Sequence, residues 1–134
     1  MTRPCYLVVD REFSSMISTR KLVIETAKFN VITAYSGEEA IEMLERFPAV
    51  DGIVMDAHMR DMTGDELVAG LKAVQPGIVV VSVHTPGAMP CYSADHHVES
   101  MQPEKLLETL RGLHPDAAEA VHRRNRELRA DESK

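Results

Sequence analysis

Three polar residues could form a site for phosphoryl transfer: Asp10, Asp56 and Ser82. Each lies at or near the end of an apolar run, "YLVVD", "GIVMD" or "GIVVVSV". Grouped carboxylate oxygens suit a hard cation such as Mg²⁺, which takes oxygen ligands and keeps several waters. Beside such a cation, an aspartate can attack phosphorus and form an acyl phosphate. One polar residue at a strand end only marks that end, whereas three at one edge would form a site.

The elements that must position these residues are strands alternating with helices. Apolar runs predict strands at 6–10, 52–56 and 77–83, and a weaker run predicts one at 30–35. Helical patterns separate them: 14–28, a segment capped by Ser36, another capped by Thr63, and one that begins at Pro103 and ends before Gly112. The runs are continuous, which is typical of strands buried on both faces of a parallel sheet. The fold class is therefore α/β, with the candidate site at the carboxyl ends of the strands.

Two segments do not follow the alternation of strands and helices. Sixteen residues, "VHTPGAMPCYSADHHV", lie between Ser82 and Glu99, and their prolines and glycine leave room for a helix of one or two turns at most. We expect one domain over 1–114 and a helical tail or linker over 115–134, capped by Asp116. The tail has a thin apolar stripe and an arginine-rich face: Ala117, Val121, Leu128, Arg123, Arg124, Arg126 and Arg129. It could be solvated, form a homodimer contact, or lead to an output domain.

Composition restricts the class of protein. The chain has 134 residues, 44% of them apolar, and a net charge of −6, as expected of one soluble globular domain. It shows no run long enough for a membrane span and no signal peptide, and its two cysteines, Cys5 and Cys91, suggest reduced thiols. We therefore expect a cytoplasmic protein without a membrane partner. The acidic balance argues against nucleic acid binding by this domain.

Five motifs resemble the receiver domains of bacterial two-component response regulators: "YLVVDREFSSM", "SGEEAIEML", "DGIVMDAHMRDMTGDEL", "IVVVS" and "QPEKLLETL". The resemblance covers about residues 4–113, and the segment around Asp56 is its most specific part. It implies a doubly wound, flavodoxin-like sheet of five parallel strands in the order 2-1-3-4-5. The short interval before Glu99 implies that the family's fourth helix is short or missing.

The same resemblance implies a role for each site residue. Asp56 matches the phosphoacceptor, and Asp10 matches the first carboxylate on the metal side. His58 would offer its backbone carbonyl to Mg²⁺, and Ser82 matches the hydroxyl that bonds the phosphoryl group and moves on activation. The partners implied are a histidine kinase or phosphotransfer protein, and an output domain or partner protein. Such a domain signals by protein contacts and is not an enzyme, although it can catalyse its own phosphorylation and dephosphorylation.

The sequence departs from the family pattern around this site. Arg11 stands where a second acid normally binds the metal, which puts the Mg²⁺ site in doubt, and Arg60 replaces a proline. Glu99 stands where the family has a lysine, and Ser100 where it has a proline. The same count places His96 at the aromatic switch position. With a glutamate instead of a lysine facing the phosphoryl group, attraction becomes repulsion, which costs several kcal/mol of free energy. Each pair of unit charges about 6 Å apart is worth on the order of 3 kcal/mol.

Arg11 could compensate in two ways. It could pair with Glu99 and leave a modified phosphorylation site, or pair with Asp56 and make the domain a phosphorylation-independent pseudo-receiver interaction module. It could also lie along the surface. A small enzyme on the same fold is disfavoured, because "DREFSS" is not a glycine-rich phosphate loop. The histidines His84, His96 and His97 lack the ligand spacing of a zinc site.

Overall fold

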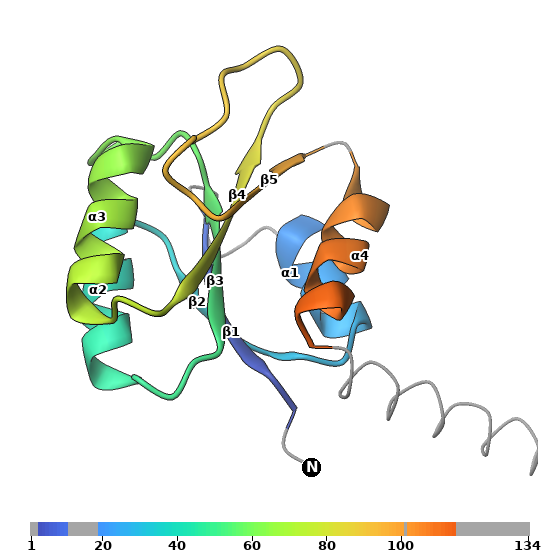
Figure 1. The fold of residues 1–134 in the computed structure, drawn as a ribbon, viewed down its shortest axis with the longest axis horizontal. Coiled ribbons are helices and arrows are strands. Elements are labelled where there is room, and N and C mark those ends of the chain that lie inside the picture. The colour runs from blue at the N-terminus through green and yellow to red at the C-terminus, as the bar shows by residue number, and fades with distance from the viewer. Residues whose placement is uncertain (1–2, 11–18, 101, 115–134) are drawn as a thin grey trace, which may run out of the picture.

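The computed structural model describes residues 3–10, 19–100 and 102–114, which form five strands and four helices (Figure 1). The elements in chain order are β1 Cys5–Val9, α1 Thr19–Thr26, β2 Asn30–Ala34, α2 Gly37–Arg46, β3 Gly52–Asp56, α3 Gly64–Val74, β4 Val79–His84, β5 His96–Glu99 and α4 Pro103–Leu113. None of the helices in this part of the chain is long and apolar enough to cross a membrane. The predicted tail helix after residue 114 lies outside the described residues.

The strands form one parallel sheet in the order β2-β1-β3-β4-β5, which confirms the predicted doubly wound fold. Helices α2 and α3 cover one face, and α1 and α4 cover the other (Figure 1). The predicted loss of the helix between β4 and β5 is also confirmed, because residues 85–95 contain only turns and bends. Gly87 in this segment has a φ of +84°, a conformation that glycine adopts readily.

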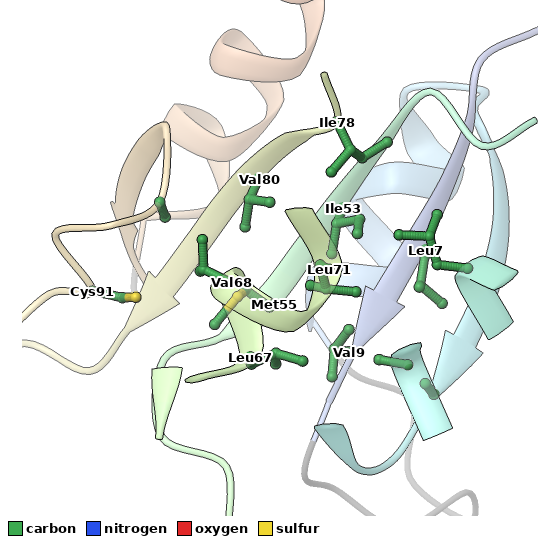
Figure 2. Packing of buried hydrophobic residues seen from close by; sticks show 14 of the residues in the cluster. Leu7, Val9, Ile53, Met55, Leu67, Val68, Leu71, Ile78, Val80 and Cys91 are labelled. Carbon is green, nitrogen blue, oxygen red and sulfur yellow. The ribbon is translucent and has the colours of Figure 1, made fainter. Parts of the chain in front are cut away.

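Alternating residues of β1, β3 and β4 fill two separate cores. On one face Leu7, Val9, Ile53, Met55 and Val80 pack under α3, as Figure 2 shows, with Leu67 and Leu71 pointing at them. On the other face the neighbouring strand residues pack under α1 and α4: Tyr6, Val8, Val54, Val81 and Val83. Each such side chain contributes about 1.5–3 kcal/mol when fully buried. Burial on both faces explains why the strands read as unbroken apolar runs.

The two predicted caps are present. The Ser36 hydroxyl accepts a hydrogen bond from the Glu39 N–H at 3.0 Å, which starts α2. The Thr63 hydroxyl accepts one from the Glu66 N–H at 3.1 Å and donates to the Glu66 carboxylate at 3.1 Å, which starts α3. These local pairs satisfy N–H groups that have no partner within a helix. Both helices therefore begin at the residues that the sequence indicated.

Two predicted boundaries are wrong. Gly112 lies inside α4, which ends at Leu113, because Gly112 does not take the left-handed conformation that makes glycine a helix terminator. The helix instead closes with a bond from the His114 N–H to the Arg111 carbonyl at 3.2 Å. Strand β4 begins at Val79, two residues later than expected, because Gly77 belongs to the turn that the Ile78 N–H closes on Gln75.

An aromatic cluster closes the amino-terminal edge of the sheet. Tyr6 is fully buried and stacks on Phe29 at 5.6 Å, and its hydroxyl lies 2.7 Å from Nε2 of His114. Burial, and to a lesser extent the nearby Asp51 carboxylate, raises the pKa of the Tyr6 phenol well above its ordinary value. The ring also lies directly over Gly52, where an added Cβ would be 2.6 Å from the Tyr6 ring.

We therefore expect Gly52→Ala to destabilise the fold by about 1–3 kcal/mol, because a buried ring or the backbone of β3 must shift to admit the methyl group. Gly77→Ala is the matched control, since an added Cβ there meets no atom within 4 Å. Urea unfolding followed by circular dichroism measures both changes. Equal stability of the two variants would show that the Tyr6 ring does not require a glycine beneath it.

Candidate functional site

Asp10 and Asp56 lie side by side at the carboxyl ends of adjacent strands. The β1–β3 ladder pairs Val8 with Val54 and Val9 with Met55, so the next residues along are the two aspartates. Both carboxylates leave the α1/α4 face of the sheet, as Val8 and Val54 do, because side chains alternate along a strand. Asp10 is fully buried and Asp56 is 6% exposed. The structure thus brings together the two carboxylates that the sequence predicted.

Backbone groups hold these two residues in place. The Asp10 N–H donates to the Ala34 carbonyl at 2.9 Å, which continues the β1–β2 pairing past the end of β1. The His58 N–H donates to Oδ1 of Asp56 at 2.8 Å. The Ala57 N–H donates to the Val83 carbonyl at 2.9 Å and anchors the chain just after β3. The His58 residue is exposed, so the turn after β3 opens to solvent directly beside the carboxylate.

Ser82 lies at the same edge of the sheet but on the other face. The register pairs Ser82 with Met55 and Val83 with Asp56, so the Ser82 and Asp56 side chains leave opposite faces. Ser82 is fully buried, and its hydroxyl lies 3.4 Å from the His96 carbonyl oxygen and 3.3 Å from Nδ1 of His97. Both of these partners belong to β5. The serine therefore links the site to the edge strand of the sheet.

The imidazole that contacts Ser82 is that of His97, which sequence reasoning missed. Ser82 and His97 are directly opposite each other in the β4–β5 ladder, so their side chains share a face. The His97 ring also meets the Tyr92 ring edge-on, with centroids 5.9 Å apart. His96, at the predicted switch position, pairs with Val81 and offers Ser82 only its carbonyl. Strand alternation from a correct β4–β5 register was the signal that could have identified His97.

Glu99 ends β5 opposite His84, at the carboxyl-terminal edge of the sheet. The two residues pair across the β4–β5 ladder, and the Ser100 N–H donates to the His84 carbonyl at 2.8 Å. Glu99 is partly exposed. Lys105, the next lysine along the chain, is exposed on α4. Arg11 lies outside the described residues, so its pairing with Glu99 or with Asp56 stays a prediction.

The donor set partly fits a magnesium ion. Within residues 3–10, 19–100 and 102–114, no group of three or more histidine, cysteine, aspartate or glutamate side chains could hold a metal. Two adjacent buried carboxylates do lie at the sheet edge, and Mg²⁺ uses one or two carboxylates and keeps several waters. Asp10 and Asp56, with the His58 carbonyl, are therefore the residues that could hold it.

Two carboxylates, those of Asp61 and Asp95, fix the loops around the site. The Asp61 carboxylate accepts hydrogen bonds from the Gly37 and Glu38 N–H groups at 3.0 Å each, which ties the loop after β3 to the start of α2. The bond from Gly37 is the main reason that the pKa of Asp61 is lower than usual. Lys72 in α3 donates to Asp95 at 3.0 Å and so holds the segment that precedes β5.

The sequence matches a family model and a curated protein. The model of the family "Response regulator receiver domain" matches residues 6–116. The transcriptional regulatory protein GlrR of Escherichia coli (strain K12) is 30% identical over 88 residues, which are 66% of this chain and 20% of GlrR. The chain therefore spans about one fifth of that curated relative.

Solved structures share the fold. The chemotaxis response regulator CheY4 of Vibrio cholerae has a TM-score of 0.70 at 25% identity, over 84% of this chain and 99% of that one. The CheX–CheY–BeF3–Mg+2 complex of Borrelia burgdorferi has a TM-score of 0.69 at 20% identity, over 82% of this chain and 88% of that one. A putative response regulator of Chloroflexus aurantiacus J-10-fl has a TM-score of 0.73 at 17% identity, over 84% and 98% of the two chains.

The Ser82–His97 contact predicts a selective effect of Ser82→Ala. We expect the imidazole Nδ1 resonance of His97 to shift in a ¹H–¹⁵N spectrum, because that nitrogen loses its hydroxyl partner. The ring of His96 is the internal control, since Ser82 reaches only its carbonyl. A shift of the His96 ring with no change at His97 would contradict the β4–β5 register.

Proposed function

The chain belongs to the response regulator receiver domain family of two-component signalling, and we propose that it accepts a phosphoryl group on Asp56 and signals through protein contacts. The observation that carries this proposal is the pair of buried carboxylates, Asp10 and Asp56, at the ends of adjacent strands. Burying two carboxylates together costs free energy unless opposite charge or hydrogen bonds compensate for it. Family members are signalling domains, and no catalysis on another substrate is proposed for this chain.

The phosphoryl donor would be a histidine kinase or a phosphotransfer protein. An oxygen of Asp56 attacks the phosphorus of a phosphohistidine, the P–N bond breaks, and its electron pair stays on the imidazole. The product on this chain is an acyl phosphate. The His58 N–H, which bonds Oδ1 of Asp56, fixes the direction of the carboxylate before the attack. The opening beside exposed His58 gives the donor a route to the carboxylate.

Magnesium suits this step. Asp10, Asp56 and the His58 carbonyl would hold Mg²⁺, which supplies positive charge to the phosphoryl oxygens. The Borrelia burgdorferi complex contains both Mg and BeF3. Arg11 replaces the usual second acid, and we propose that its guanidinium contributes part of the charge that the family obtains from a lysine. Glu99, which the resemblance puts at the lysine position, would work against phosphorylation through its negative charge.

Ser82 would transmit the effect of Asp56 phosphorylation to the surface of the domain. Its hydroxyl now bonds β5. Although the Ser82 and Asp56 side chains leave opposite faces of the sheet, a phosphoryl group on Asp56 would extend past the strand ends and offer the hydroxyl stronger, charged acceptors there. Leaving β5 would release the His97 ring and, through it, Tyr92. We propose that residues 1–114 form the receiver domain, and that residues 115–134 lead to an output domain or partner protein.

We expect the intact mass to rise by one phosphoryl group after incubation with acetyl phosphate and Mg²⁺. Asp56→Asn should abolish this gain, because an amide oxygen is a poor nucleophile, and omission of Mg²⁺ should also prevent it. Circular dichroism of the variant checks that it is folded. Uptake by the Asp56→Asn variant would refute the acceptor assignment. No uptake by the folded natural protein would favour the phosphorylation-independent interaction module.

Glu99→Lys should increase the rate of phosphoryl uptake by at least about tenfold, because it replaces a repelling charge beside the site with an attracting one. Glu104→Lys is the matched control, since Glu104 is exposed in the first turn of α4 and its replacement makes the same change in net charge. Time courses of intact mass measure both rates. Equal acceleration by the two variants would mean that only net charge matters and that Glu99 does not face the site.

A further inference from the structure

A pocket of about 590 Å³ opens between the loop after β3 and the segment that replaces the helix between β4 and β5. Its lining consists of residues 57–66 and 89–92. Asp10, Asp56 and Ser82 do not line it, whereas His58, whose carbonyl could hold magnesium, does, so the pocket adjoins the phosphoryl site. The pocket lies on the side of the sheet that α3 covers, and α1 and α4 cover the other side.

The rim of this pocket is apolar and exposed. Met89 is 71% exposed and Tyr92 is 69% exposed, the two highest values among the large apolar side chains that the structure describes. Met59 and Met62 are partly buried in the opposite wall. Methionines adapt their shape to a ligand, and tyrosine is common in protein interfaces. An exposed group of this kind indicates a binding surface.

Acidic residues outnumber basic ones in the lining of the pocket. Asp61, Asp65 and Glu66 line the pocket, against one arginine, Arg60. The lowered pKa of Asp61, due mainly to the Gly37 hydrogen bond, keeps that carboxylate ionised at neutral pH. Asp65 is held in place by the Ser93 hydroxyl, which donates to it at 2.6 Å. The pocket therefore suits a polypeptide segment with bulky apolar side chains between cationic ones.

We propose that this pocket binds the segment 115–134 of a second copy of the chain. The sequence "VHRRNRELR" in that segment carries four arginines and one glutamate, and it begins with Val121 and includes Leu128. The charge of this stretch, residues 121–129, is opposite to that of the acidic residues that line the pocket, and Val121 and Leu128 can enter the methionine-lined centre. Two copies that exchange these segments form a symmetric dimer with two identical contacts. This contact does not require phosphorylation.

The geometry of the chain favours a second copy over the chain's own segment. The His114 ring is hydrogen-bonded to Tyr6 near the start of β1, whereas the pocket is lined by the loop after β3 and the segment after β4. Figure 1 shows that α4 ends at the opposite edge of the sheet from the loop after β3. Val121 follows His114 by seven residues, which span at most about 25 Å when fully extended. Five strand residues alone cover about 17 Å, and the segment would also have to pass around the sheet from the α4 face to the α3 side. A partner molecule imposes no such limit.

Sedimentation velocity on the full chain over a wide concentration range tests the proposal. We expect a monomer–dimer equilibrium that weakens as salt is added, because the contact is partly ionic. Met89→Glu and Arg124→Glu should each weaken it at least tenfold. Phe47→Glu and Arg3→Glu are the matched controls, since Phe47 is 50% exposed, Arg3 is exposed, and neither lines the pocket.

A mixture of the two weakened variants gives the decisive result. The Met89→Glu protein keeps an intact segment and the Arg124→Glu protein keeps an intact pocket, so together they can form one complete contact. We expect the mixture to associate at concentrations where each variant alone is monomeric. A wild-type protein that stays monomeric, an Arg124→Glu protein that dimerises normally, or a mixture that fails to associate would each overturn the proposal.

Discussion

Two carboxylates buried side by side are the constraint around which this edge of the sheet is arranged. An ionised group removed from water costs several kcal/mol unless hydrogen bonds or opposite charge compensate. Asp10 is fully buried and Asp56 nearly so, because β1 and β3 are neighbours whose apolar residues are covered on both faces. The compensation has to come from the groups at the strand ends, such as the His58 N–H that bonds Asp56. Any cation or arginine side chain that reaches this edge would compensate the same two negative charges.

Local features of the chain were predictable from sequence because the interactions that determine them are local. Ser36 and Thr63 cap their helices through partners three residues away, and Pro103 starts α4 where proline is tolerated. The apolar runs indicated the strands, and the polar ends of two of them indicated Asp10 and Asp56 as neighbours. The strand order came from a family resemblance, since no local interaction specifies which strands pair.

Features that depend on the register between strands were not predictable in the same way. The contact of Ser82 with His97 follows from the β4–β5 pairing, whereas a count back from the "PEKLLETL" motif could only place His96 at the switch position. The pocket beside the site combines a loop after β3 with a segment some thirty residues later, which pack together only in the folded chain. The end of α4 was misplaced because Gly112 is a terminator only in a left-handed conformation, which it does not adopt.

Tyr92 connects the candidate site and the pocket. Its ring contacts His97, which contacts Ser82, and the same residue lines the pocket. If phosphorylation of Asp56 draws Ser82 away from β5, the wall of the pocket loses part of its support, and the affinity of the pocket for its ligand changes. Thermodynamic linkage makes this coupling reciprocal, so a segment bound in the pocket must change the stability of the phosphorylated state by the same factor. The missing helix is what makes this route short, because Tyr92, in the segment that replaces the helix, contacts His97 of β5, and His97 contacts the buried serine.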